Sequence, residues 1–149
     1  MAVTEGELAA LRALLLGDEQ DYLPLTARLT DDDMRSYELL LQATLALAAT
    51  RRFAAGFSDA GLIRYVARVR AGTAERAEDM ALDPLATEAV LRHALGQDAP
   101  YVADPWTRLR SVVALLTVLF GDLALGESRV DALLAEARAL ADRWLMELA

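Results

Sequence analysis

The chain has 149 residues, 55% of them apolar, and it contains no cysteine. A chain of this length fits one domain with its own core, and without cysteine it has no thiol nucleophile, zinc–thiolate site or disulfide framework. Acidic residues outnumber basic ones by 23 to 15, and the bases are scattered rather than gathered into the basic patch that nucleic-acid binders use, so we expect no nucleic-acid partner.

The composition favours helices throughout. Ala, Leu, Arg and Glu dominate the chain, and all four are good helix formers. Runs that alternate apolar and polar residues, as half-buried strands require, do not occur. We therefore expect an all-α fold, organised as one helical domain over residues 1–149.

The first predicted helix begins at Thr4. With Glu7 three residues later, Thr4 forms a capping-box pattern, and Gly17 ends the helix. Residues 18–29 contain Pro24, so they predict a connector with room for a turn of helix.

The next predicted helix, over residues 30–55, is the longest. Thr30 precedes three aspartates, and acids in the first turn stabilise the positive end of the helix dipole. The side chains of residues 31–33 point in different directions around a helix, so capping explains them better than a metal site does. Gly56 ends this helix.

Ser58 predicts the start of a further helix, which Gly72 and Thr73 break, and a short helix over residues 74–82 follows. Two more helix starts are predicted by Asp-Pro pairs, because Asp caps a helix and Pro fits its first position. These pairs are Asp83-Pro84 and Asp104-Pro105. The helix after the first pair ends at Gly96.

The helix from Trp106 to Leu125 is the most apolar element and is apolar on more than one face, so we expect it at the centre of the fold. Its apolar run has about 15 residues and includes Asp122, whereas a membrane span needs about 20. We therefore expect no membrane association and a soluble, cytoplasmic protein. Ser128 opens a final amphipathic helix, which completes a bundle of about six helices around the central one.

Standard catalytic motifs are missing. The chain has no lysine, which excludes a P-loop and Schiff-base chemistry, and it has no nucleophile elbow. His93 is the only histidine, so it has no second histidine to share a metal or haem with, and its place at a helix end is typical of a structural residue. We expect no metal, no cofactor, and a binding role in preference to an enzyme.

One polar pair stands out. Glu88 and Arg92 are four residues apart among leucines, and an ion pair in apolar surroundings indicates partial burial. Arg64 and Arg68 share one face of a preceding helix and can complete a network, and Tyr101 lies in the irregular segment that follows. Together they predict either a polar ligand pocket under an aromatic lid or a salt bridge that joins two helices, and we favour the salt bridge.

The helix over residues 30–55 is apolar nearly all round, like the helix from Trp106. A bundle of this size buries one such helix completely, whereas a second one leaves an apolar patch, and such patches mark partner surfaces. We therefore expect a homodimer whose interface includes Leu39, Leu40 and Leu47.

These observations favour a helical protein–protein interaction or regulatory module, homodimeric and able to bind a protein partner. The alternative is a small-molecule-binding helical bundle with a polar pocket near Glu88 and Arg92. An enzyme without a standard motif is the least expected of the three.

Overall fold

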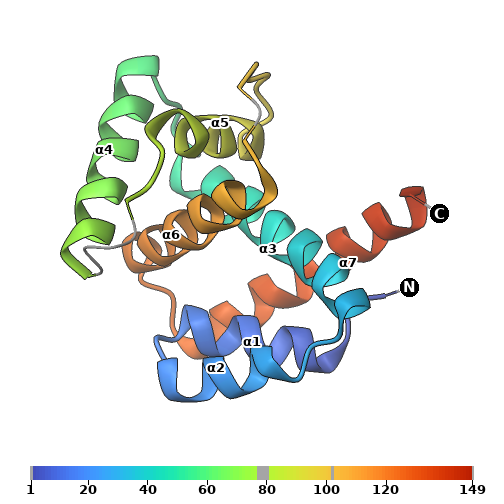
Figure 1. Ribbon diagram of the computed structural model, residues 1–149. Helices are drawn as coiled ribbons and strands as arrows, with labels where there is room; N and C mark the ends of the chain where they lie inside the picture. Colours follow the sequence, from blue (N-terminus) through green and yellow to red (C-terminus); the bar gives the residue numbers. More distant parts are fainter. Residues whose placement is uncertain (1, 77–80, 102, 149) are drawn as a thin grey trace. The chain divides into compact units, whose positions relative to one another are not determined.

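The computed structural model describes residues 2–76, 81–101 and 103–148, and every regular element in these residues is an α-helix (Figure 1). The predicted all-α fold is therefore confirmed. The described residues form seven helices, where about six were expected. None of the seven is long and apolar enough to cross a membrane.

The chain divides into two compact units. Unit 1 comprises residues 1–47 and 124–149, and unit 2 comprises residues 48–123. The single domain expected over residues 1–149 stays a prediction.

Unit 1 contains α1 (Glu5–Leu15), α2 (Glu19–Ala27), α7 (Glu127–Leu148) and the larger part of α3 (Asp31–Arg52). Helix α1 packs against both α2 and α7. Small and branched apolar side chains form its core. They include Val3, Ala10, Leu11, Leu40, Leu41, Leu133, Ala137 and Ala141.

The helix caps predicted at Thr4 and Thr30 of unit 1 are confirmed, whereas the start predicted at Ser128 is wrong, because α7 already begins at Glu127. The Thr4 hydroxyl accepts a hydrogen bond from the Glu7 amide at 3.3 Å. At the start of α3, the Thr30 hydroxyl accepts from the Asp33 amide at 3.2 Å, and the Asp33 carboxylate accepts from the Thr30 amide at 3.0 Å. The reciprocal pair satisfies two backbone donors that a helix start leaves open, which is the capping role expected for this aspartate.

The connector expected over residues 18–29 is wrong, because α2 occupies most of it. The Asp18 carboxylate caps this helix by accepting from the Asp21 amide at 3.3 Å. Pro24 lies inside the helix and costs it a backbone hydrogen bond. Packing against α1 compensates for that loss, and the Tyr22 hydroxyl also lies 3.5 Å from the hydroxyl of Tyr37 on α3. Tertiary contacts therefore override the local proline signal.

Unit 2 contains α4 (Asp59–Arg76), α5 (Pro84–Ala94), α6 (Pro105–Leu123) and the last turn of α3. Helix α6 packs against both α4 and α5, so it is the central helix of this unit, as the sequence predicted. Trp106 at its start is 64% exposed, so the buried face of the helix begins further along the chain. The fully or nearly buried side chains are Ser111, Val112, Ala114, Leu115, Leu116, Leu119 and Phe120.

The break expected at Gly72 and Thr73 is wrong, because α4 continues through both residues to Arg76. Thr73 is buried, and its hydroxyl donates to the Val69 carbonyl at 3.0 Å, which satisfies the polar group inside the helix. A single glycine costs a helix only about 1 kcal/mol, so packing outweighs it. The short helix expected over residues 74–82 includes residues 77–80, which lie outside the described part of the chain.

A buried acid lies at the centre of unit 1. The Glu7 side chain has no exposed surface, and its Oε1 accepts a hydrogen bond from the Ser36 hydroxyl at 2.5 Å. Its Oε2 is buried and has no hydrogen-bond partner among the described residues. Burial raises the pKa of Glu7 despite the Ser36 bond, and the charge of Asp33 adds to the effect. A carboxylate in this position destabilises unit 1 when it ionises.

We predict that Glu7→Gln stabilises the protein at about pH 8 by about 1 kcal/mol, because it removes a buried charge. A raised folded-state pKa means that the stability contribution of Glu7 is complete below about pH 4.3 and is lost as the pH rises through the folded value. The free energy of unfolding, measured with urea from about pH 4.3 to about pH 8, should therefore change less with pH for the variant than for the wild type. Glu147→Gln, at an exposed position of α7, is the matched control. A variant that is less stable than the wild type at about pH 8, with an unchanged pH profile, would contradict this account.

Candidate functional site

A shallow pocket of about 500 Å³ lies in unit 2 where α3 ends and α4 begins. Its wall consists of arginine, aromatic and small residues, with no acidic residue among them. The lining residues are Arg52, Phe53, Gly56, Phe57, Ser58, Gly61, Arg64, Tyr65 and Arg68. The segment joining the two helices supplies Gly56 and Ser58, and the first turn of α4 supplies Gly61. Gly56 adopts a positive φ of 103° that favours glycine there.

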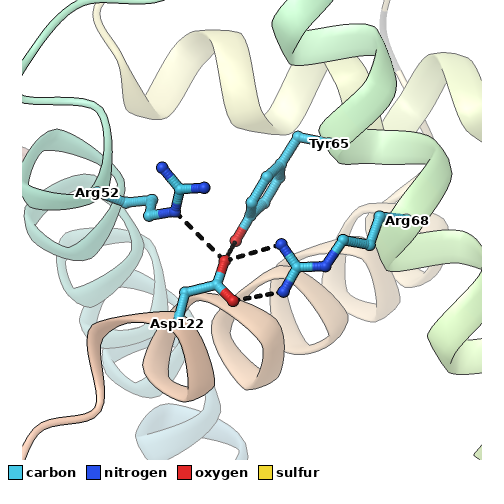
Figure 2. A network of polar contacts seen from close by, with 4 residues as sticks. All are labelled: Arg52, Tyr65, Arg68 and Asp122. Atoms are coloured by element: carbon cyan, nitrogen blue, oxygen red, sulfur yellow. Dashed lines mark hydrogen bonds and ion pairs between the residues drawn. The ribbon is translucent and has the colours of Figure 1, made fainter.

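One carboxylate holds three of the neighbouring side chains together. Figure 2 shows Asp122 of α6 facing Arg52 from the end of α3 and Tyr65 and Arg68 from α4. Its Oδ2 accepts hydrogen bonds from the Tyr65 hydroxyl at 2.8 Å, from Arg68 Nη1 at 3.2 Å and from Arg52 Nε at 3.3 Å. Its Oδ1 accepts from Arg68 Nη2, so the Arg68 pair is bidentate.

The network keeps Asp122 ionised. The Asp122 side chain is only 15% exposed, and this burial acts to raise its pKa. Hydrogen bonds from Arg68, Tyr65 and Arg52 outweigh burial, so the pKa of Asp122 lies below its ordinary value. The pKa of Tyr65 is raised, first by burial and then by its bond to Asp122, so the phenol stays a neutral donor.

The aromatic side chains of the pocket wall contact two of its arginines and one another. The Arg52 and Arg68 guanidinium carbons lie 5.4 and 5.5 Å from the Tyr65 ring centroid, and Figure 2 shows the ring between the two groups. Phe53 meets Tyr65 edge-on at 5.2 Å and Phe57 edge-on at 6.1 Å. Cation–π and edge-to-face contacts of these lengths are favourable, so the rings fix the positions of the two arginines.

Positive charge remains at the pocket after these contacts. Arg52, Arg64 and Arg68 line it, whereas Asp122 is the single carboxylate bonded to any of them in the described part of the chain. Arg64 is exposed and makes no hydrogen bond or ion pair to any residue that the structure describes. Such a wall can attract and bind an anion through guanidinium N–H donors, with aromatic surface beside them.

The Glu88 and Arg92 pair predicted from the sequence does form, with Arg92 Nη2 3.7 Å from Glu88 Oε1. Arg92 also donates to Asp59 Oδ1 and to Gln97 Oε1, both at 2.9 Å. These bonds join α5 to the first turn of α4 and to the segment after α5. Neither member of the pair lines the pocket.

The structure places the other predicted binding residues in two different locations. Arg64 and Arg68 line the same pocket, but their surroundings are Asp122 and the aromatic rings rather than Glu88 and Arg92. The Tyr101 hydroxyl donates to Asp83 Oδ2 at 2.8 Å, and this bond is the main cause that lowers the pKa of Asp83. Tyr101 therefore attaches its loop to the start of α5 and does not line the pocket.

The three leucines predicted at an interface differ in exposure. Leu40 has no exposed surface in the chain, so a partner cannot reach it in this structure. Leu39 and Leu47 are half-buried and keep some surface.

Four residues of the site are not among those predicted from the sequence, namely Asp122, Arg52, Phe53 and Phe57. A signal for the first of them exists, because Asp122 is the only charge in the apolar run of α6. A charge in such a run must find a partner when it is buried, and arginines on neighbouring helices are the available cations. The partners themselves depend on which helices pack against α6.

No group of three or more His, Cys, Asp or Glu side chains in the described residues is arranged to hold a metal ion. Comparison of the chain with protein-family models, with curated proteins and with solved structures found no match.

We predict that Asp122→Asn lowers the free energy of unfolding by about 2 kcal/mol, because it weakens three charge-assisted or polar contacts at a mostly buried position. The lowered folded-state pKa means that the stabilisation is complete above about pH 3.9 and is lost as the pH falls through the folded value. The difference in unfolding free energy between the wild type and Asp122→Asn should therefore become smaller in acid. Chemical denaturation at several pH values measures this difference.

Asp131→Asn is the matched control. Asp131 accepts from Arg12 Nε at 2.7 Å, but its side chain is 52% exposed, so the change should cost about 0.5 kcal/mol. Equal losses of unfolding free energy from the two substitutions would show that the Asp122 network stabilises the protein no more than an ordinary surface ion pair does.

Proposed function

We propose that this protein is a small-molecule-binding protein and that the pocket of unit 2 binds an anionic ligand. The observation that carries the proposal is the pocket wall, in which three guanidinium groups line one depression without an acidic neighbour in the wall. Arginine matches the planar geometry of carboxylate and phosphate groups better than any other side chain does.

Pre-organisation supports this function. Arg52 and Arg68 are held by Asp122 and by the Tyr65 ring before any ligand arrives. Ordering long side chains on binding costs about 0.5–1.5 kcal/mol each, and this wall has already met much of that cost in folding. The arrangement therefore presents the free Nη groups of Arg52 to a ligand from a fixed position, with Arg68 holding the carboxylate that fixes it.

The size and chemistry of the pocket agree with a small ligand. Small-molecule sites usually enclose about 300–1,000 Å³ and combine apolar walls with a few polar groups. At about 500 Å³, with three aromatic rings and three arginines, this pocket has that composition. We place the activity in the cytoplasm, the location expected from the composition of the chain.

The proposed binding pocket is not the one expected near Glu88 and Arg92, because neither residue lines it. The proposal keeps Arg64 as a ligand-binding residue and adds Arg52, while Arg68 lines the same pocket with both Nη groups bonded to Asp122. The bonds of Arg92 to Asp59 and Gln97 support a structural role for that arginine instead.

Arg64→Ala should weaken the binding of a small aryl anion by about tenfold, because a hydrogen bond to a charged group contributes about 1.5–3 kcal/mol. Isothermal titration calorimetry at low salt, with phenyl phosphate and with benzenesulfonate, measures this effect. Arg64 has no partner to lose among the described residues, so the melting temperature should stay unchanged.

The control is Arg129→Ala, which removes an equally exposed arginine of α7 in unit 1 and gives the same change in net charge. Binding should be unaffected by that change. If neither anion binds saturably, or if both variants lose affinity equally, the pocket is not the binding site.

We also propose that the protein forms a homodimer that can take part in protein–protein contacts. Support comes from exposed apolar side chains of unit 1, since monomeric proteins seldom leave large apolar areas in water. The most exposed are Leu23, Met146 and Leu148. Leu39 and Leu47 of α3 are half-buried and keep some surface.

Light scattering at micromolar concentration should give twice the mass of the chain. Leu39→Arg should shift the protein toward the monomer, because a charge is costly to bury in an interface. Arg35→Glu, at an exposed position one turn earlier on α3, is the control for a change of charge alone. A monomer mass for the unmodified protein would exclude the homodimer.

A further inference from the structure

Building on the proposed anion-binding function, we infer that the ligand is a dianionic phosphate monoester attached to a planar aromatic body. Three properties of the pocket lead to this class: its residual charge, the N–H donors that remain unused, and the aromatic surface beside them.

The residual charge of the pocket matches a dianion. Arg52, Arg64 and Arg68 supply three positive charges, and Asp122 compensates one of them. A sulfonate or carboxylate ligand would leave one guanidinium uncompensated, whereas the doubly ionised form of a phosphate monoester neutralises both. Asp59, next to the lining residue Ser58, does not line the pocket, and its carboxylate accepts from Arg92.

The unused donors match the three terminal oxygens of a phosphate. Arg68 directs both Nη atoms at Asp122, so it serves mainly to position the carboxylate. Arg52 reaches Asp122 through Nε alone, which leaves its two Nη groups without a hydrogen-bond acceptor among the described residues. The N–H groups of Arg64 likewise have no acceptor in the part of the chain that the structure describes. Two guanidinium groups with open donors can each make paired hydrogen bonds to phosphate oxygens.

Asp122 is engaged by the protein's own donors. Its Oδ2 accepts three hydrogen bonds and its Oδ1 accepts one, so most of the acceptor capacity of the carboxylate is used within the protein. Its function in the site is to hold Arg52 and Arg68 and to reduce their mutual repulsion. It positions the binding residues without touching the ligand.

The aromatic surface accounts for the planar body. A bare phosphate ion would leave most of a pocket of about 500 Å³ unfilled. Phe57 is 39% exposed beside the arginines, and Phe53 is fixed edge-on between Phe57 and Tyr65. Exposed ring surface of this kind stacks favourably on another ring. A flat group attached to the phosphate is therefore a better fit than a sugar or an aliphatic chain.

The test compares phenyl phosphate with benzenesulfonate, which has the same ring and one charge fewer, on the full chain by calorimetry at about pH 7.5 and about pH 5. A phosphate monoester loses its second charge near pH 6. We expect phenyl phosphate to bind about tenfold more tightly at the higher pH and to lose most of this advantage at the lower one, while benzenesulfonate is unchanged.

The pocket itself should not titrate between these pH values. The raised pKa of Tyr65 keeps the phenol neutral, and the lowered pKa of Asp122 keeps the carboxylate ionised. Arginine as a residue type is protonated throughout this range. Any loss of affinity specific to phenyl phosphate therefore reports the second ionisation of the ligand.

Two further ligands test whether the bound molecule has a planar body and whether it is a nucleotide or a simple aryl phosphate. Cyclohexyl phosphate should bind several-fold more weakly than phenyl phosphate, and Phe57→Ala should remove that difference. Adenosine monophosphate carries a planar base beyond a ribose, so tighter binding than phenyl phosphate would assign a nucleotide, and weaker binding would assign a simple aryl phosphate.

Equal affinity for phenyl phosphate and benzenesulfonate at both pH values, with both lost in Arg64→Ala, would overturn the dianion inference and leave the anion-binding function intact. Equal binding of cyclohexyl and phenyl phosphate would overturn the planar body alone. The absence of saturable binding by every probe would overturn the inference and the proposed function together.

Discussion

The arrangement of unit 2 at the pocket depends on a single ionised carboxylate. Asp122 lies near the end of α6 with little exposed surface, so its charge requires hydrogen-bond donors from within the protein. Arg52, Tyr65 and Arg68 supply them from the end of α3 and from α4. Hydrogen bonding to Asp122 thus brings Arg52 and Arg68 beside the ring of Tyr65. Arg64, one turn before Arg68, adds a third arginine to the same wall. The functional property of the pocket, its excess of positive charge, is a consequence of this packing requirement.

Local chemistry explains how much of the fold could be predicted. Reciprocal capping at Thr30 and Asp33 and the Asp83-Pro84 pair act within four residues, so the helix starts follow from the sequence alone. Helix α2 was missed because its proline is a local signal, whereas its packing against α1 is not. The continuation of α4 through Gly72 was missed for the same reason. Tertiary contacts decide the cases in which local preferences are weak.

The site was predictable only in part. Arg64 and Arg68 were identified as a pair on one helical face, and they do line one pocket. Their partner was not identified, because the choice between Glu88 and Asp122 depends on which helix faces them. The aromatic wall could not be predicted from the sequence either. Phe53 is in the segment after α3, and its contacts to Phe57 and Tyr65 follow from the turn at that point. Residue types and spacing indicate which side chains can pair, and packing selects among them.

The central claim is that open guanidinium donors of the pocket bind an anion while Asp122 keeps its own partners. Proton–nitrogen correlation spectra of the arginine Nε groups, recorded during titration with phenyl phosphate, test it directly. We predict large shifts for Arg64, a smaller shift for Arg52, and almost none for Arg68, whose bonds to Asp122 persist. Shifts that are equal across the arginines of both units, or largest at Arg129 on α7, would contradict the account.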